Sequence, residues 1–161
     1  MEEDAMLTFT LTSEAFADGE TIPDRHTCDG EDVSPPLAWE GAPAETETFA
    51  IVVHDPDAPR GDWVHWVLYD VPGHASQLPD GIEDEASLEN LGCAIQGKND
   101  FGRLGWGGPC PPPGRPHRYV FEISALDDRL ELESGASREE VERAMEGHVL
   151  ARAELTGTFG R

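Results

Sequence analysis

The sequence has little positive charge, and this scarcity excludes several classes of protein. Of its 161 residues, 11 are Lys or Arg and 33 are Asp or Glu, so the formal net charge is −22 at pH 7, and Lys98 is the only lysine. An acidic excess of this size argues against a surface that binds nucleic-acid phosphates, and it also disfavours contact with an anionic membrane. We therefore expect no nucleic-acid partner and no stable membrane association.

Long apolar segments and cysteine motifs are missing too. The longest apolar runs, such as Phe49 to Val53, are far too short to span a bilayer, and the first residues lack the basic and apolar regions of a signal peptide. Cys28, Cys93 and Cys110 are far apart and odd in number, so we expect neither a disulfide framework nor a CxxC metal site. These absences predict a soluble protein of a reducing, cytoplasmic compartment.

The negative charge itself is spread along the chain. Carboxylates run from Glu2 to Glu154 without forming one block, which disfavours an acidic tail or a single interaction surface. Acid excess with almost no lysine is typical of organisms that keep molar salt in the cytoplasm, where the Debye length shrinks to roughly 3 Å and self-repulsion is screened. We interpret the composition as a halophilic adaptation.

The apolar residues follow mainly the period of a β-strand. The length suits one domain, which we expect to span 1–161. Strands are predicted over 6–12, 48–54, 63–70, 118–126 and 150–159. Ser137 and Glu140 form a capping-box pattern that predicts one helix over 138–147, whereas 13–47 and 71–117 look irregular. The pattern favours a mainly antiparallel β-sandwich with a minor helical layer.

The strand 63–70 is apolar on both faces and should lie in the middle of a sheet. Strict alternation would place Trp63, His65, Val67 and Tyr69 on one of its faces. His65 is an ionisable ring in this apolar setting. Taken alone, such a residue is more often a hydrogen-bonded core histidine than part of a site.

Two stiff segments carry further candidates for chemistry. The segment Asp55-Pro56-Asp57-Ala58-Pro59 follows a buried strand, and its prolines restrict the backbone around two carboxylates, although an isolated turn of this kind is more often structural. The stretch 107–117 holds five prolines and must be a rigid loop, with a polyproline recognition ligand as the alternative interpretation. His117 and Tyr119 follow it and should point to the same side of a strand.

Six blocks of the sequence together resemble the phosphatidylethanolamine-binding protein family, in particular its bacterial and archaeal branch, which is described as Raf kinase inhibitor-like. The blocks are Cys28-Asp29-Gly30 through Pro35-Pro36, Asp55 to Pro59, Trp63 to Trp66, Gly97-Lys98-Asn99-Asp100, Gly108 to Pro112 with His117 to Tyr119, and Glu154 to Arg161. They cover nearly the whole chain in the right order. Compared with animal members, the proline loop has an extra residue and a cysteine, Cys110.

The resemblance implies a Greek-key β-sandwich with a small cavity for phosphate-like anions, such as the phosphate of a phosphorylated small molecule or lipid head group. The residues that match the family's pocket motifs are Asp55, Asp57, Pro59, Trp63, His65, Gly108, Pro109, His117 and Tyr119. The resemblance implies a non-enzymatic binding or regulatory module without a cofactor. It also implies a homodimer, and a partner protein that no motif specifies.

Two other functions remain open at this stage. Asp55, His65 and His117 are suitable residue types for a hydrolase or for a metal-binding enzyme. The usual nucleophile, zinc and phosphate-loop motifs are absent from the sequence. A purely structural acidic protein would leave His65 and the proline loop without a role.

Overall fold

The computed structural model describes residues 8–161, which are mostly strands. The elements in chain order are β1 (Thr10–Thr12), η1 (Asp24–His26), β2 (Leu37–Glu40), β3 (Thr48–Asp55), β4 (Trp63–Pro72), β5 (Gln77–Leu78), β6 (Ser87–Leu88), η2 (Glu89–Leu91), β7 (Ala94–Gln96), β8 (His117–Leu126), α2 (Arg138–Met145) and β9 (Val149–Phe159). The strands predicted over 48–54, 63–70, 118–126 and 150–159 and the helix predicted over 138–147 form with small shifts at their ends, whereas the strand predicted over 6–12 forms only over Thr10–Thr12. Of the strand expected over 6–12, residues 6 and 7 lie outside the described residues.

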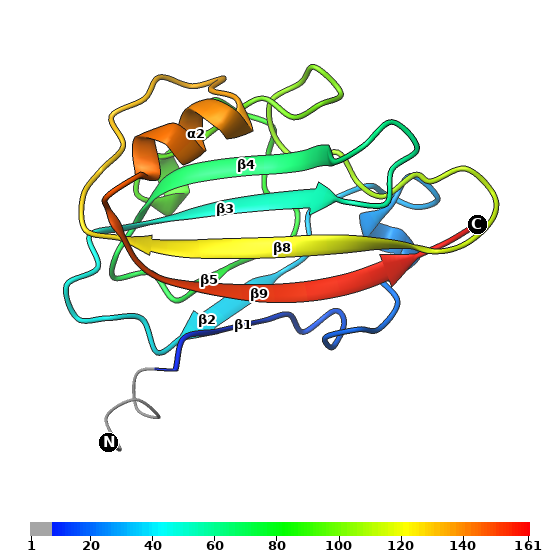
Figure 1. The fold of residues 1–161 in the computed structure, drawn as a ribbon, viewed down its shortest axis with the longest axis horizontal. Helices are drawn as coiled ribbons and strands as arrows, with labels where there is room; N and C mark the ends of the chain where they lie inside the picture. Colours follow the sequence, from blue (N-terminus) through cyan, green and yellow to red (C-terminus); the bar gives the residue numbers. More distant parts are fainter. Residues whose placement is uncertain (1–7) are drawn as a thin grey trace.

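Two antiparallel sheets face each other (Figure 1). The larger sheet has the order β6-β7-β4-β3-β8-β9, and the smaller has the order β1-β2-β5. The view in Figure 1 shows the smaller sheet behind the larger one, with α2 beside β4. The predicted mainly β fold with a minor helical layer is confirmed.

A hydrophobic core fills the space between the sheets, and a second one lies under α2. In β3, alternate residues Phe49, Ile51 and Val53 belong to the core between the sheets. Ala50 belongs to the cluster that packs with Val141 of α2. Every residue of β3 is buried because both faces of this central strand are covered.

A β-bulge breaks the predicted alternation of β4. In the ladder with β3, Val53 pairs with Trp66 and His54 pairs with Val64, so His65 has no partner. Trp66 consequently packs between the sheets, whereas Val64 packs under α2. The expectation that 63, 65, 67 and 69 share one face is wrong, because Val67 and Tyr69 also lie under α2. The bulge leaves His65 facing the other side of the sheet, against Tyr119.

The irregular segments contain four strands that the sequence did not predict. These are β2, β5, β6 and β7, each of two to four residues. Segments of this length are too short to show a hydrophobic period. They form because the fold brings each beside another strand: β2 pairs with β1 and β5, and β7 pairs with β4 and β6. In the described part of the chain, no helix has the length and apolar character needed to cross a membrane.

The cysteine prediction is wrong. Cys28 and Cys110 form a disulfide across a separation of 82 residues, and Cys93 is the free thiol. Both bonded cysteines lie in irregular segments that the fold brings together, and neither the number nor the spacing of cysteines encodes that proximity. The argument from cysteine usage to a reducing compartment therefore loses its basis.

Candidate functional site

The candidate residues converge at one end of the larger sheet. Asp55 is the last residue of β3 and pairs with Trp63 at the start of β4, while His117 begins β8. In Figure 1 this is the right-hand end of the sheet, where the proline loop and the C-terminus also lie. Adjacent antiparallel strands therefore bring together residues that are far apart in the sequence.

A cavity of about 220 Å³ opens at this end of the sheet. It is lined by Asp55, Ala58, Pro59, Trp63, His65, Phe101, Cys110, Pro111, Pro112, His117 and Tyr119. Six of the nine predicted site residues are in this lining, and Asp57, Gly108 and Pro109 are not. Ala58, Phe101, Cys110, Pro111 and Pro112 are lining residues that the sequence analysis did not assign to a site.

Asp55 orients His117 within the cavity. The Nδ1 of His117 lies 2.7 Å from Oδ2 of Asp55, which is buried, and Oδ1 of Asp55 accepts the backbone N–H of Asp57 at 2.8 Å. With Nδ1–H donated to Asp55, the Nε2 of His117 is left for a ligand. Burial and the carboxylates of Asp55 and Asp57 raise the pKa of Tyr119. Its hydroxyl therefore keeps its proton and can donate a hydrogen bond.

His65 is held by a different partner, a backbone carbonyl. Its Nδ1 donates to the carbonyl oxygen of Gly107 at 2.5 Å. Burial lowers the pKa of His65, and this outweighs the Gly107 bond and the carboxylates of Asp55, Asp32 and Asp100, which favour protonation. The ring is therefore neutral near pH 7, and its Nε2 carries a lone pair that can accept a proton.

Phe101 forms an aromatic wall at the mouth of the cavity. The residue is 40% exposed, and its ring makes edge-on contacts with the rings of Trp63 and His65, with centroids 5.5 and 5.4 Å away. The guanidinium of Arg103 lies 5.6 Å from the centre of the Phe101 ring. Phe101 belongs to a turn without periodicity, so no sequence signal marked it as a site residue.

Gly108 and Pro109 support the cavity wall from outside. The N–H of Gly108 donates to Oδ1 of Asp32 at 2.9 Å, and the carbonyl of Pro109 accepts the N–H of Cys28 at 3.1 Å. A Cβ atom on Gly108 would lie 2.3 Å from the same Asp32 oxygen and 2.4 Å from the carbonyl oxygen of His26. Glycine is therefore needed for this close approach.

Asp57 fastens the turn between β3 and β4 to β8. Its carboxylate accepts hydrogen bonds from the backbone N–H, Nε and Nη2 of Arg118, each at 2.9 Å. The side-chain and backbone hydrogen bonds of Arg118 hold the pKa of Asp57 at about 2. Asp57 therefore lies at the outer rim of the cavity, where its carboxylate is paired with Arg118.

A second polar cluster lies on the opposite face of the sheet, behind the cavity. Nδ1 of His54 is 2.6 Å from Asp62, and Nε2 lies 3.5 Å from the Glu122 carboxylate, beyond good hydrogen-bond geometry. Asp62 also binds Arg138 of α2 at 2.7 Å, and Arg138 binds Glu142 at 2.9 Å. Burial disfavours a charge on His54, but the carboxylates of Glu122 and Asp62 outweigh it and raise the pKa of His54.

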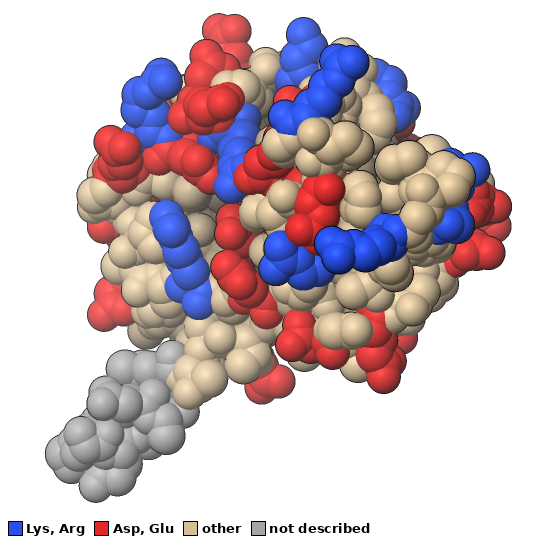
Figure 2. Space-filling view, turned by 45° about the vertical axis from the view of Figure 1, so that its right-hand side comes forward, with Lys and Arg blue, Asp and Glu red and all other residues tan. Residues whose placement is uncertain are grey.

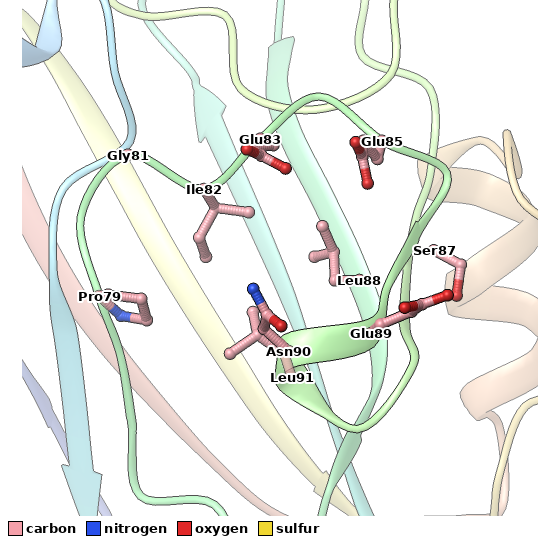
Figure 3. Close-up of a pocket in the computed structure, with 10 residues that line it drawn as sticks. All are labelled: Pro79, Gly81, Ile82, Glu83, Glu85, Ser87, Leu88, Glu89, Asn90 and Leu91. Carbon is pink, nitrogen blue, oxygen red and sulfur yellow. The ribbon is translucent and has the colours of Figure 1, made fainter.

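A larger cavity, of about 330 Å³, lies elsewhere and contains none of the predicted site residues. It is lined by residues of 79–91 alone. Figure 3 shows Ile82, Leu88 and Asn90 turned toward this hollow, with Glu83 and Glu85 along its edge. Its lining contains no histidine, tyrosine or cationic side chain, so we place the candidate site in the 220 Å³ cavity that contains His65 and His117.

Comparison with known proteins agrees with the geometry. The family model for phosphatidylethanolamine-binding protein matches residues 12–160. The chain belongs to the phosphatidylethanolamine-binding protein family. It is 48% identical to a UPF0098 protein of Methanothermobacter thermautotrophicus over 151 residues, which are 94% of this chain and 98% of that protein.

Solved structures of family members share the fold. A phosphatidylethanolamine-binding protein homologue from Chlamydia trachomatis superposes with a TM-score of 0.87 at 38% identity, covering 96% of this chain and 99% of the other. Escherichia coli YbcL, described as a member of the mammalian family, superposes with a TM-score of 0.85 at 34% identity, covering 95% and 98%. The resemblance seen in the sequence is thereby confirmed.

Proposed function

We propose that this chain is a non-enzymatic binding module whose cavity takes a phosphate-like anion or the phosphate of a phosphorylated small molecule. Membership of the family supports a binding or regulatory role. The observation that carries the proposal is the pair of imidazoles, His65 and His117, in one small cavity. Both rings engage Nδ1 with the protein, which leaves each Nε2 for a ligand.

The side chains of the cavity suit a phosphate group that is protonated before it binds or becomes protonated on binding. Tyr119 supplies a hydroxyl group, and His117, whose Nδ1 is held by the Asp55 carboxylate, supplies its Nε2. Neutral His65 instead accepts a proton or a hydrogen bond from the ligand. The phosphate monoanion, which carries one P–OH group, can satisfy both kinds of partner.

The size of the cavity supports a head group rather than a whole lipid. Cavities for drug-sized ligands usually measure about 300–1,000 Å³, and this one is about 220 Å³. A phosphoryl group with a short substituent fits that volume. The aromatic wall of Phe101 and Trp63 would contact the substituent at the mouth.

Titration calorimetry with phosphoethanolamine at fixed high salt tests the proposal. Wild type, His65→Ala and His117→Ala should be compared between pH 8 and pH 6. Binding by wild type should strengthen as the pH falls, because a larger share of the phosphoethanolamine then carries the P–OH group that neutral His65 can accept from, as the pH approaches the ligand's second pKa of about 6. Undiminished binding in both variants, without pH dependence in any of the three proteins, would refute the anion cavity.

The alternative function is a hydrolase or a metal-binding enzyme that uses Asp55, His65 and His117. The Asp55–His117 hydrogen bond is the observation that favours it, because such a pair can act in acid–base catalysis. Residues 8–161 contain no cluster of three or more His, Cys, Asp or Glu arranged to hold a metal ion. Metal analysis of the purified protein, with an assay for phosphate release from phosphoethanolamine, separates the two functions.

A further inference from the structure

The proline wall of the cavity has almost no backbone donors with which to attach itself to the protein. Four of the five residues over 109–113 are prolines, and proline lacks an N–H group. Cys110 is the exception, and it lines the cavity together with Pro111 and Pro112. This wall must therefore be held by something other than a ladder of backbone hydrogen bonds.

Hydrogen bonds hold the loop at its two ends. The N–H of Gly108 donates to Asp32 at one end, and the N–H of Gly114 donates to the carbonyl of Arg161 at 3.2 Å at the other. Between them, the Pro109 carbonyl accepts the N–H of Cys28, and the Cys28–Cys110 disulfide closes the same contact covalently. Pro111 adds apolar packing, since it is buried. The disulfide is thus the strongest link between the lining of the cavity and the segment 26–33.

The disulfide is also open to attack. Cys28 and Cys110 are both exposed, so a small dithiol can reach the bond. Nη1 of Arg161 lies 3.5 Å from the Cys110 sulfur, and Nε of Arg161 lies 3.5 Å from Asp29. A guanidinium beside one sulfur stabilises the thiolate that forms there, which makes Cys110 the better leaving group.

We propose that the Cys28–Cys110 disulfide positions the proline wall and that its reduction by a dithiol loosens the wall and weakens anion binding. The binding part of this inference rests on the proposed function. With the bond intact, Pro111 and Pro112 are pre-organised against the cavity. Without it, the loop is attached by the hydrogen bonds of Gly108, Pro109 and Gly114 and by packing, with no covalent link at Cys110. Part of the binding free energy must then be used to order the loop.

The reaction is a two-step thiol–disulfide exchange. A thiolate of the dithiol attacks the Cys28 sulfur, the bond between the two cysteines breaks, and Cys110 leaves as a thiolate beside Arg161. The second thiol of the reagent then displaces Cys28 from the mixed disulfide. The reagent is oxidised to its own disulfide, and its two electrons and two protons end on the cysteines.

The test uses the full chain carrying Cys93→Ser, so that thiol counting reports only the bond in question. Oxidised protein and protein reduced with dithiothreitol should be compared by thiol titration, by hydrogen exchange and by calorimetry with inorganic phosphate. We expect thiols to appear only on reduction, exchange over 107–117 to accelerate, and phosphate affinity to fall about tenfold. Reoxidation should restore both, and the double variant Cys28→Ser/Cys110→Ser should behave as the reduced protein does.

Arg161→Gln is the matched control for the chemistry. Arg161 does not line the cavity, so oxidised Arg161→Gln should bind phosphate as its parent does and be reduced several-fold more slowly. Equal affinity and equal exchange in the oxidised and reduced proteins would overturn the inference. If phosphate binds in neither state, the proposed function fails, and hydrogen exchange over 107–117 still decides whether the disulfide holds the wall.

Discussion

Asp55 and Asp57 lie two residues apart on one stiff turn, but their carboxylates do different things. Asp55 is buried and holds the ring of His117 in the cavity. Asp57 lies outside the cavity and is occupied by Arg118. The same residue type therefore positions a cavity histidine at one position and fastens a turn at the other.

At the residue scale we predict that Asp55→Asn and Asp57→Asn separate these roles. Asp55→Asn removes the carboxylate that accepts the Nδ1–H of His117 and orients its ring, so the affinity for phosphoethanolamine should fall about tenfold or more. Asp57→Asn should leave the affinity within about twofold, because its partner Arg118 is outside the cavity. Calorimetry at pH 6.5 measures both, and equal losses in the two variants would return Asp57 to the site.

The turn after β3 and the helix α2 are linked at the element scale through Asp62. This residue precedes Trp63 of the cavity and binds both His54 of β3 and Arg138 of α2. The face of the sheet behind the cavity is thus held by charges that are only partly exposed. The raised pKa of His54 makes this link sensitive to pH.

Stability should therefore depend on His54 in a defined direction. The pKa of His54 is higher in the folded state than in the unfolded chain. Its contribution to the free energy of unfolding is therefore fully present at pH values below the unfolded-state pKa, and it is lost as the pH rises through the folded-state pKa. Urea unfolding of wild type and His54→Gln should differ by on the order of 1 kcal/mol at pH 5.5 and by much less at pH 8.5. His148→Gln is a control, since its pair with Asp127 is exposed. A difference that grows toward alkaline pH would contradict this assignment.

At the scale of the whole molecule, acidic residues outnumber basic ones by 33 to 11. Figure 2 shows acidic side chains over the visible face, with basic side chains between them. With a net charge of −22, self-repulsion acts on the folded state at every point of the surface. Salt screens that repulsion, and the anion binding that we propose would then depend on the local donors of the cavity.

The melting temperature should accordingly rise steeply between about 0.1 and 3 M KCl, because the Debye length shortens from roughly 10 Å to a few Å or less. Differential scanning calorimetry over this range checks the halophilic interpretation. A titration with sucrose, which stabilises proteins without screening charge, serves as the control. A flat or falling curve in KCl would mean that the acidic composition has another origin.

The sequence by itself determined the long strands, the helix and the two stiff segments. Short apolar runs specify β3 and β4, and patterns closer to alternation specify β8 and β9, because such patterns depend on near neighbours alone. The capping box does the same for α2, where Ser137 and Glu140 exchange the expected hydrogen bonds. The family motifs also led to Asp55, His65, His117 and Tyr119, which meet in one cavity.

Only the tertiary structure decided how these segments meet. The bulge at His65 depends on the register between β3 and β4, and a shift by one residue reverses the face to which a side chain points. The disulfide joins residues 82 apart, and Phe101 reaches the cavity mouth from an aperiodic turn. Asp57 is outside the cavity because Arg118 lies next to it on β8. Contacts of this kind arise from the packing of distant segments, which no local pattern in the chain records.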